Sequence, residues 1–246
     1  MALRKLCRFI TAAALLPLSA QPQTHFEVAA IRPNPAGPSA GTSFNVFEGG
    51  RIKITNEPVK LLIRVAYQLQ NAEIAGGPNW LDTDRYDLEA KTGRPEKPSQ
   101  GDLGPFMQSL LAERFNLKFH WETRELTVYA MVTAKTGPKL KAKGEGEMAA
   151  MNTSGGAGGS HLTATAASMD MLARYIGNRL DRIVLDKTNL TDAYDFTLDW
   201  APVQTPDSSS PSLVTALAEQ LGLKLESQKS PVKVLVIDAL ERPSEN

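Results

Sequence analysis

His120 and Glu122 are the residues whose types and spacing come closest to a metal site in this sequence. They lie two positions apart where apolar and polar residues alternate, so a strand would place both side chains on one face, within reach of one ion. A metal site needs at least a third ligand, and neither a His-x-x-x-His pattern nor clustered carboxylates lie nearby. An exposed polar strand face explains the pair equally well, so we assign no metal ligand and no cofactor.

Motifs of nucleophilic catalysis fail on their context. Residues 230–233 (SPVK) match S-x-x-K and residues 135–137 (KTG) match K-T-G, two motifs of penicillin-recognising enzymes. There the serine begins a helix and precedes the K-T-G strand, whereas here it lies between predicted strands and the order of the motifs is reversed. The single cysteine, Cys7, lies in the predicted signal segment described below. We therefore expect neither a nucleophile elbow nor Cys–His chemistry, and we assign no catalytic residue.

Two acidic segments, residues 84–87 (DRYD) and 192–195 (DAYD), resemble paired carboxylates for acid–base work. Because they recur at corresponding places, a role in the fold is favoured: an aspartate at a strand entry accepts backbone N–H groups in a turn, while the tyrosine packs inside. The glycine-rich stretch 154–159 (SGGAGG) lacks the lysine and the preceding strand of a phosphate-binding loop. We interpret that stretch as part of a linker.

The elements that would position these residues are written twice in the sequence. Leu62 and Arg64 of the first copy match Leu172 and Arg174 of the second. The offsets of the matched blocks are 110, 108 and 106 positions, which indicates an internal duplication with little drift. The matched blocks are 51–64 with 161–174, 84–88 with 192–196, and 107–132 with 213–238.

Each copy predicts the element order βαββαββ, which suggests an α+β fold in the form of a two-layer sandwich built from two tandem repeats. Segment 117–122 alternates as a strand with one wet face, and segment 126–132 is apolar and β-branched enough to be a separate central strand. The same holds for 232–237 in the second copy. A leading strand is expected over residues 25–31.

The first helix of each copy carries an apolar stripe at the i, i+3, i+4, i+7 spacing. Asn56 is the expected cap of the first of these helices, with Pro58 in its first turn, and Ser168 begins the second. For the last helix we expect Ser210 as the cap and Gly222 just past the end. The stripes are Leu62, Val65, Ala66 and Leu69; Leu172, Tyr175, Ile176 and Leu180; and, in the last helix, Leu213, Val214, Leu217 and Leu221.

The chain has 27 basic and 27 acidic residues among 246, a balance that argues against binding to nucleic acid. A single cysteine excludes an intrachain disulfide framework and a cysteine-based zinc site.

The first twenty residues have the layout of a secretory signal peptide. Arg4, Lys5 and Arg8 precede an apolar run over residues 9–18, and small residues indicate cleavage after Ala20. The run is too short to cross a bilayer about 30 Å thick, although an uncleaved anchor is the alternative. We predict a secreted or periplasmic protein whose mature chain has no transmembrane segment. The division of the sequence is then a signal peptide (1–20), a first repeat with its leading strand (21–135), a flexible linker (136–160) and a second repeat (161–246).

Five segments of the chain resemble a secreted bacterial family, the domain-of-unknown-function family 3738. The resemblance spans nearly the whole predicted mature chain and implies no established activity or catalytic residue. Related domains are fused to membrane metallopeptidases of the antibiotic-sensor type, which implies an extracytoplasmic sensing or interaction role. The segments are FEVAAIRPN (26–34), GGPNWLDTDRYDLEAK (76–91), and residues 110–141, 186–200 and 212–246.

We expect an exported, non-enzymatic binding or interaction module whose partner is an unknown envelope ligand or protein. A duplicated fold places a cleft or paired sheet edges where the copies meet, and a ligand or peptide strand could dock there. The alternative is an extracytoplasmic hydrolase with dispersed carboxylates or a His120/Glu122 metal site. A third hypothesis is regulation of a partner peptidase in trans.

Overall fold

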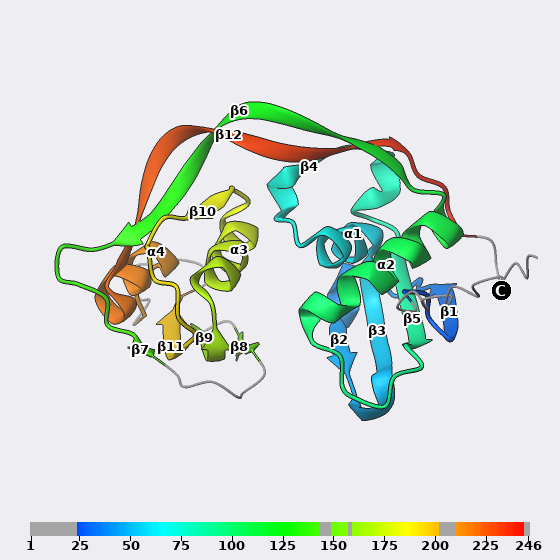
Figure 1. Cartoon of the computed structure of the whole chain (residues 1–246), viewed down its shortest axis with the longest axis horizontal. Helices are drawn as coiled ribbons and strands as arrows, with labels where there is room; N and C mark the ends of the chain where they lie inside the picture. The colour runs from blue at the N-terminus through cyan, green and yellow to red at the C-terminus, as the bar shows by residue number, and fades with distance from the viewer. Residues whose placement is uncertain (1–23, 143–148, 157–158, 202–209, 244–246) are drawn as a thin grey trace, which may run out of the picture.

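Two strands much longer than the others run across the whole molecule and join its two lobes (Figure 1). These are β6 (Lys118–Thr133) and β12 (Leu223–Ala239), which pair antiparallel to form a ribbon. The structure is a computed structural model that describes residues 24–142, 149–156, 159–201 and 210–243. The predicted signal peptide and its cleavage point at Ala20 lie outside these residues. No helix in the described ranges is long and apolar enough to span a bilayer.

The first lobe contains a four-stranded antiparallel sheet in the order β1-β5-β3-β2, packed against α1 and α2. Ser99 caps α2, because its hydroxyl accepts the Asp102 N–H while the Asp102 carboxylate accepts the Ser99 N–H. The bounds are β1 Val28–Pro33, β2 Ser43–Val46, β3 Arg51–Pro58, α1 Val59–Tyr67, β4 Ile74–Gly76, β5 Arg85–Lys91 and α2 Gln100–Phe115, with single 3₁₀ turns at Pro38–Ala40, Glu48–Gly50, Asn71–Glu73 and Asn79–Leu81.

The second lobe repeats this arrangement with the sheet order β7-β11-β9-β8 and the helices α3 and α4. Ser168 caps α3 as predicted, since its hydroxyl accepts the Met171 N–H at 3.2 Å. The bounds are β7 Lys141–Ala142, β8 Ala150–Gly156, β9 Gly159–Ala167, α3 Met169–Leu180, β10 Val184–Asp186, β11 Tyr194–Trp200 and α4 Leu213–Ala216, which continues as a π-helical turn over Leu217–Leu221. The coexistence of helices and mainly antiparallel sheets confirms the α+β class.

Each lobe completes its structure with a strand from the other half of the sequence. The short strand β4 pairs in parallel with the end of β12, with Ile74 opposite Leu235. In the second lobe, β10 pairs in parallel with the end of β6, with Val184 opposite Tyr129. The sequence division at residue 135 therefore does not coincide with the division between the lobes.

The hydrophobic cores depend on the same exchange. Leu235 and Ile237 of β12 are buried in the core of the first lobe, and Met131 of β6 is fully buried in the core of the second. Burial of each such side chain contributes about 1.5–3 kcal/mol. A third, smaller cluster lies on the ribbon itself and includes Val128 and Val232.

The centre of the ribbon lies where the sequence alignment places it. Aligning residues 107–132 on 213–238 makes Glu125 the counterpart of Pro231, and these two residues are opposite each other in the ribbon. Pairs on either side are related in the same way: Met131 lies opposite Leu225, and Phe119, the counterpart of Leu225, lies opposite Ile237. The pairing thus has the register of an approximate two-fold axis through the Glu125–Pro231 pair.

Three sequence-based expectations about the elements differ from the structure. The two strands predicted over 117–122 and 126–132 are one continuous strand, β6. The intervening residues are polar because this stretch of ribbon is half-exposed between the lobes, not because the chain turns. The last helix is capped by Ser212 rather than Ser210, since the Ser212 hydroxyl accepts the Thr215 N–H, and Val214 of its predicted stripe is 44% exposed.

The segment predicted as a linker, 136–160, contains strands in its described residues. Lys141–Ala142 forms β7, and Ala150–Gly156 forms β8, which pairs with β9 in a regular antiparallel register. Its high glycine and serine content therefore does not prevent pairing at a sheet edge.

The two acidic segments have the fold role that their recurrence predicts. The Asp87 carboxylate accepts the Asn56 N–H at 2.8 Å, and the Asp195 carboxylate accepts the Ala166 N–H at 2.9 Å. Asn56 and Ala166 have left-handed backbone angles, with φ of 57° and 46°, beside irregularities in the β3–β5 and β9–β11 pairings. Asn56 consequently lies before the helix and does not cap it, and Pro58 occupies the N-cap position of α1 without a side-chain capping hydrogen bond. The carboxylates offset the cost of these conformations, which is about 1–2 kcal/mol per residue.

Gln70 joins the lobes by a second contact beneath the ribbon. Its side-chain amide donates to the Val184 carbonyl at 2.9 Å and accepts the Val184 N–H at 2.8 Å, as a neighbouring strand would. The Asn71 N–H donates to the Asn178 side chain at 2.8 Å beside it. Gln70 is 4% exposed, so these hydrogen bonds are shielded from water.

Gly177→Ala is expected to destabilise the protein by about 1–3 kcal/mol, because a Cβ there would overlap the Gln70 amide oxygen and lie 2.8 Å from the Arg182 carbonyl oxygen. Gly101→Ala is the matched control, since its Cβ would meet nothing nearer than Ser99 Oγ at 3.8 Å. Urea unfolding of both variants measures the difference, and a Gly177→Ala midpoint equal to that of the wild type would contradict the role of Gln70.

Candidate functional site

A cleft of about 700 Å³ lies between the two lobes. Its walls come from α1 and the edge strand β2 on one side, and from α3 and the edge strand β8 on the other (Figure 1). Small-molecule and peptide sites occur preferentially at such domain interfaces, in pockets of about 300–1,000 Å³.

The cleft is lined by residues at corresponding positions of the two copies. Three pairs lie on the facing helices, and a fourth joins the residue that follows α1 to a residue of α3; each is separated by the offset of 110 positions that relates Arg64 to Arg174. A fifth pair lies on the edge strands: Phe44 is opposite Ile54 and Met151 is opposite Ala164, and Ile54 and Ala164 are again 110 positions apart. The pairs are Leu61 and Met171, Arg64 and Arg174, Val65 and Tyr175, Gln68 and Asn178, and Phe44 and Met151.

Arg64 and Glu57 form the charged part of the first wall. Burial lowers the pKa of Arg64, an effect that the nearby Glu57 carboxylate opposes. Burial also raises the pKa of Glu57, against the Thr42 hydroxyl and the positive charges of Arg85 and Arg64. The Arg64 Nε is buried and has no hydrogen-bond partner. A buried donor without a partner costs about 1–3 kcal/mol.

Arg174 and its neighbours form the second wall. Arg174 pairs with Asp170 one helical turn earlier, and the Tyr175 hydroxyl shares a hydrogen bond of 2.9 Å with the Thr153 hydroxyl of β8. Desolvation raises the pKa of the nearby Glu73, while its hydrogen bond from the Gln70 N–H and the charge of Arg174 lower it. The hydrogen bond between Tyr175 and Thr153 links α3 to the edge strand β8 in this wall.

The lining combines apolar side chains, two guanidinium groups, two carboxylates and two side-chain amides. Glu57 and Asp170 balance Arg64 and Arg174, so the cleft has no large excess of either charge. No histidine, cysteine or lysine lies among its lining residues. The arrangement therefore suits recognition of a ligand through apolar contacts and directed hydrogen bonds.

His120 and Glu122 lie together on the outer face of the ribbon, away from the cleft. His120 Nε2 is 3.0 Å from Glu122 Oε1, and Nδ1 is 2.8 Å from Asp238 Oδ1 on β12. Arg124 Nε donates to the other Glu122 oxygen at 2.7 Å. In the described part of the chain, no group of three or more His, Cys, Asp and Glu side chains is arranged to hold a metal ion.

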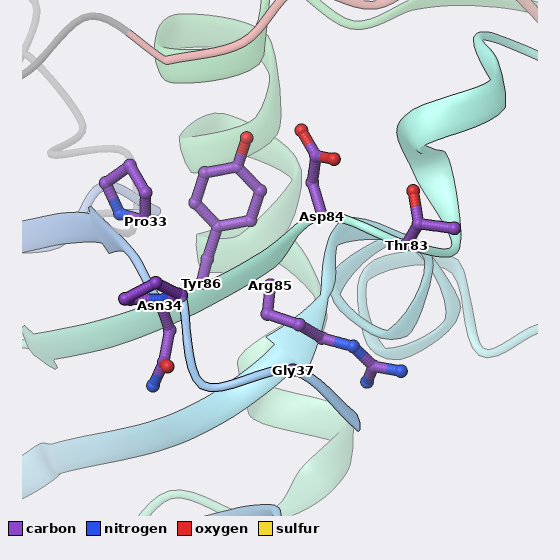
Figure 2. Close-up of a pocket in the computed structure, with 8 residues that line it drawn as sticks. Pro33, Asn34, Gly37, Thr83, Asp84, Arg85 and Tyr86 are labelled. Atoms are coloured by element: carbon purple, nitrogen blue, oxygen red, sulfur yellow. The ribbon is translucent and has the colours of Figure 1, made fainter. Parts of the chain in front are cut away.

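A second, more open hollow of about 540 Å³ lies beside the first acidic segment (Figure 2). Asp84 and Tyr86 point to one side of the strand in Figure 2, and Arg85 points to the other. Asp84 accepts a hydrogen bond from Arg242 at 2.8 Å, and Tyr86 is 4% exposed. The acidic and aromatic groups here are already engaged in the fold, so the hollow is a weaker candidate than the cleft.

Residues 37–41 (GPSAG) have the G-x-S-x-G spacing of a nucleophile elbow, so the expectation that no such elbow is present cannot rest on the absence of this pattern. A nucleophile elbow places its serine on a sharp turn from a strand into a helix. Ser39 instead lies in an exposed 3₁₀ turn that is followed by the strand β2. The motif therefore does not have the structural context of a hydrolase.

A family model described as "Protein of unknown function (DUF3738)" matches residues 60–240. The chain belongs to the DUF3738 family. This confirms the resemblance seen in the sequence. The DUF3738 match runs from α1 to just beyond β12, so it includes both facing helices and the whole ribbon. No curated protein and no solved structure matched the chain.

The residues of the cleft were not predicted from the sequence. The signal was present in two places: Arg64 and Arg174 match in the alignment, and Val65 and Tyr175 belong to the predicted apolar stripes. Leu62 and Leu172 of the same stripes are buried in the cores, whereas Val65 and Tyr175 face the cleft. Each apolar stripe therefore includes residues that pack in a core and residues that line the cleft.

The pKa of His120 is expected to lie above its ordinary value, because the protonated ring donates hydrogen bonds to Glu122 and Asp238. The contribution of this cluster to stability is then fully present below the ordinary pKa and is lost as the pH rises through the raised one. NMR titration of the His120 ring measures the pKa, with the Glu122→Gln/Asp238→Asn double variant expected to lower it. An unchanged pKa in the double variant would contradict the assignment.

Proposed function

We propose that this DUF3738 protein is an exported, non-enzymatic binding module whose ligand occupies the cleft between the lobes. We further propose that it consists of two copies of one α+β unit, and that a secretory signal peptide directs the chain to the periplasm or the exterior of a bacterial cell. Its partner is an envelope ligand or protein rather than nucleic acid.

The matched lining of the cleft is the observation that carries this proposal. Two copies of one unit, related by an approximate two-fold axis, bring the same helix face together from both sides. A face used only for core packing would be apolar, whereas each of these carries an arginine and an amide-bearing side chain at corresponding positions. Arg64 and Arg174 both line the cleft, so their guanidinium groups can donate charge-assisted hydrogen bonds to a ligand.

Arg64→Gln is expected to weaken ligand binding about tenfold or more, since a hydrogen bond to a charged group contributes about 1.5–3 kcal/mol and 1.4 kcal/mol is tenfold in affinity. Calorimetry with purified cell-wall fragments and fractionated envelope extract measures the effect. Arg51→Gln is the matched control, because Arg51 lies over the Phe47 ring at 4.5 Å and does not line the cleft.

Two results would contradict the proposed function. Equal binding by the Arg64→Gln and Arg51→Gln variants would place the ligand elsewhere. Catalytic turnover of a bound fragment by the wild-type protein would show that the module is an enzyme.

The alternative of a hydrolase with dispersed carboxylates or a His120/Glu122 metal site has its own test. We expect the untagged protein to contain no stoichiometric metal, because both His120 ring nitrogens face carboxylates in an exposed salt-bridge cluster. Elemental analysis of the wild type and of His120→Ala measures this, and a stoichiometric metal that the variant loses would support the alternative.

A further inference from the structure

We propose that the occupant of the cleft is an extended peptide that adds as a strand to the outer edge of β8, with which no strand in the described part of the chain pairs. This proposal rests on the cleft being the binding site and specifies the chemical class of its ligand. A free strand edge presents backbone N–H and C=O groups at a regular spacing, and another extended chain is the partner that satisfies them.

Three other sheet edges, those of β1, β7 and β10, are each protected by a different feature. On β1, Arg32 and Pro33 interrupt the edge, and β7, of which the structure describes two residues, contains a lysine. At β10, the Gln70 side chain occupies both the N–H and the C=O of Val184. Charges, proline, short length and side-chain cover are the usual means of preventing edge-to-edge pairing.

The edges that face the cleft have none of these features. β8 (Ala150–Gly156, AMNTSGG) and β2 (Ser43–Val46, SFNV) contain no charged residue and no proline. Among the strands that the structure describes, nothing pairs with the outer side of either one. The two sheets lie with these edges toward each other in Figure 1, in the order β7-β11-β9-β8 and then β2-β3-β5-β1. β8 is the longer edge, with seven residues against four, so we assign the pairing to it.

The side chains around β8 suit a peptide. Met151, Met171 and Tyr175 provide apolar surface for alternate side chains of an added strand. The balance of Arg64 and Arg174 with Glu57 and Asp170 fits a chain of mixed charge better than a polyanion. Phe44 of β2 lines the opposite wall of the same cleft.

Selection from a displayed library of random linear peptides, followed by hydrogen exchange on the intact protein, tests the proposal. Bound peptide should slow exchange of amides within Ala150–Gly156 and leave β1 and β7 unchanged. Peptides selected on the wild type should bind Arg64→Gln about tenfold more weakly if Arg64 donates to them.

A proline scan of β8 separates backbone pairing from side-chain contact. Along an edge strand, the backbone N–H groups point alternately toward the neighbouring strand and outward. Of the two variants Asn152→Pro and Thr153→Pro, one therefore removes an outward donor. The other breaks the pairing with β9 and lowers the thermal midpoint of unfolding. The variant that keeps the wild-type midpoint should lose peptide binding at least tenfold, and alanine at the same position should retain it.

Each remaining outcome is informative. Two outcomes would overturn this inference and leave the proposed function unchanged. One is Arg64-dependent binding of cell-wall fragments without any peptide binding. The other is peptide binding that does not slow amide exchange in β8. Absence of any cleft binding would overturn both. If the wild type self-associates and the proline variant does not, the edge of β8 pairs with a second copy of the chain. That result would overturn the inference that the ligand is a peptide.

Discussion

The pairing of β6 with β12 is the interaction on which the rest of the structure depends. Each of these strands begins in one lobe and ends in the other, where it pairs with a short strand of the opposite half. Leu235 and Ile237 are thereby buried in the first core, and Met131 in the second. Each core therefore contains side chains from both halves of the sequence, although each lobe looks like a separate domain.

This exchange also explains where the candidate site lies. The ribbon is symmetric about the Glu125–Pro231 pair, so it sets α1 and α3 face to face beneath it. Gln70 then links the lobes a second time, with its amide completing the edge of β10. The walls of the cleft are consequently held by the fold itself, and a ligand would meet a largely preformed surface, which reduces the entropic cost of binding.

The sequence predicted the α+β class and the fold role of Asp87 and Asp195. These follow from local patterns: hydrophobic periods, a serine cap at Ser168 and a recurring acidic segment. The exchange between the halves was not predictable, because Leu235 reads as a core strand residue whichever lobe receives it. Residues 123–125 separated two predicted strands, because the composition of an exposed ribbon and that of a loop are alike. The cleft was not predicted for a related reason: Val65 and Tyr175 have the spacing of ordinary members of an apolar stripe that packs in a core.

The central claim is that the ribbon brings two matched helix faces together to form one binding site. Hydroxyl-radical footprinting of the intact protein, free and saturated with ligand, tests it most directly, because the readily oxidised side chains Met151, Met171 and Tyr175 line the cleft. Trp121, which is 38% exposed on the ribbon, serves as an internal reference. The account predicts protection of the three cleft residues with Trp121 unchanged. Protection of Trp121, or of the open hollow around Tyr86, with the cleft residues unaffected would contradict it.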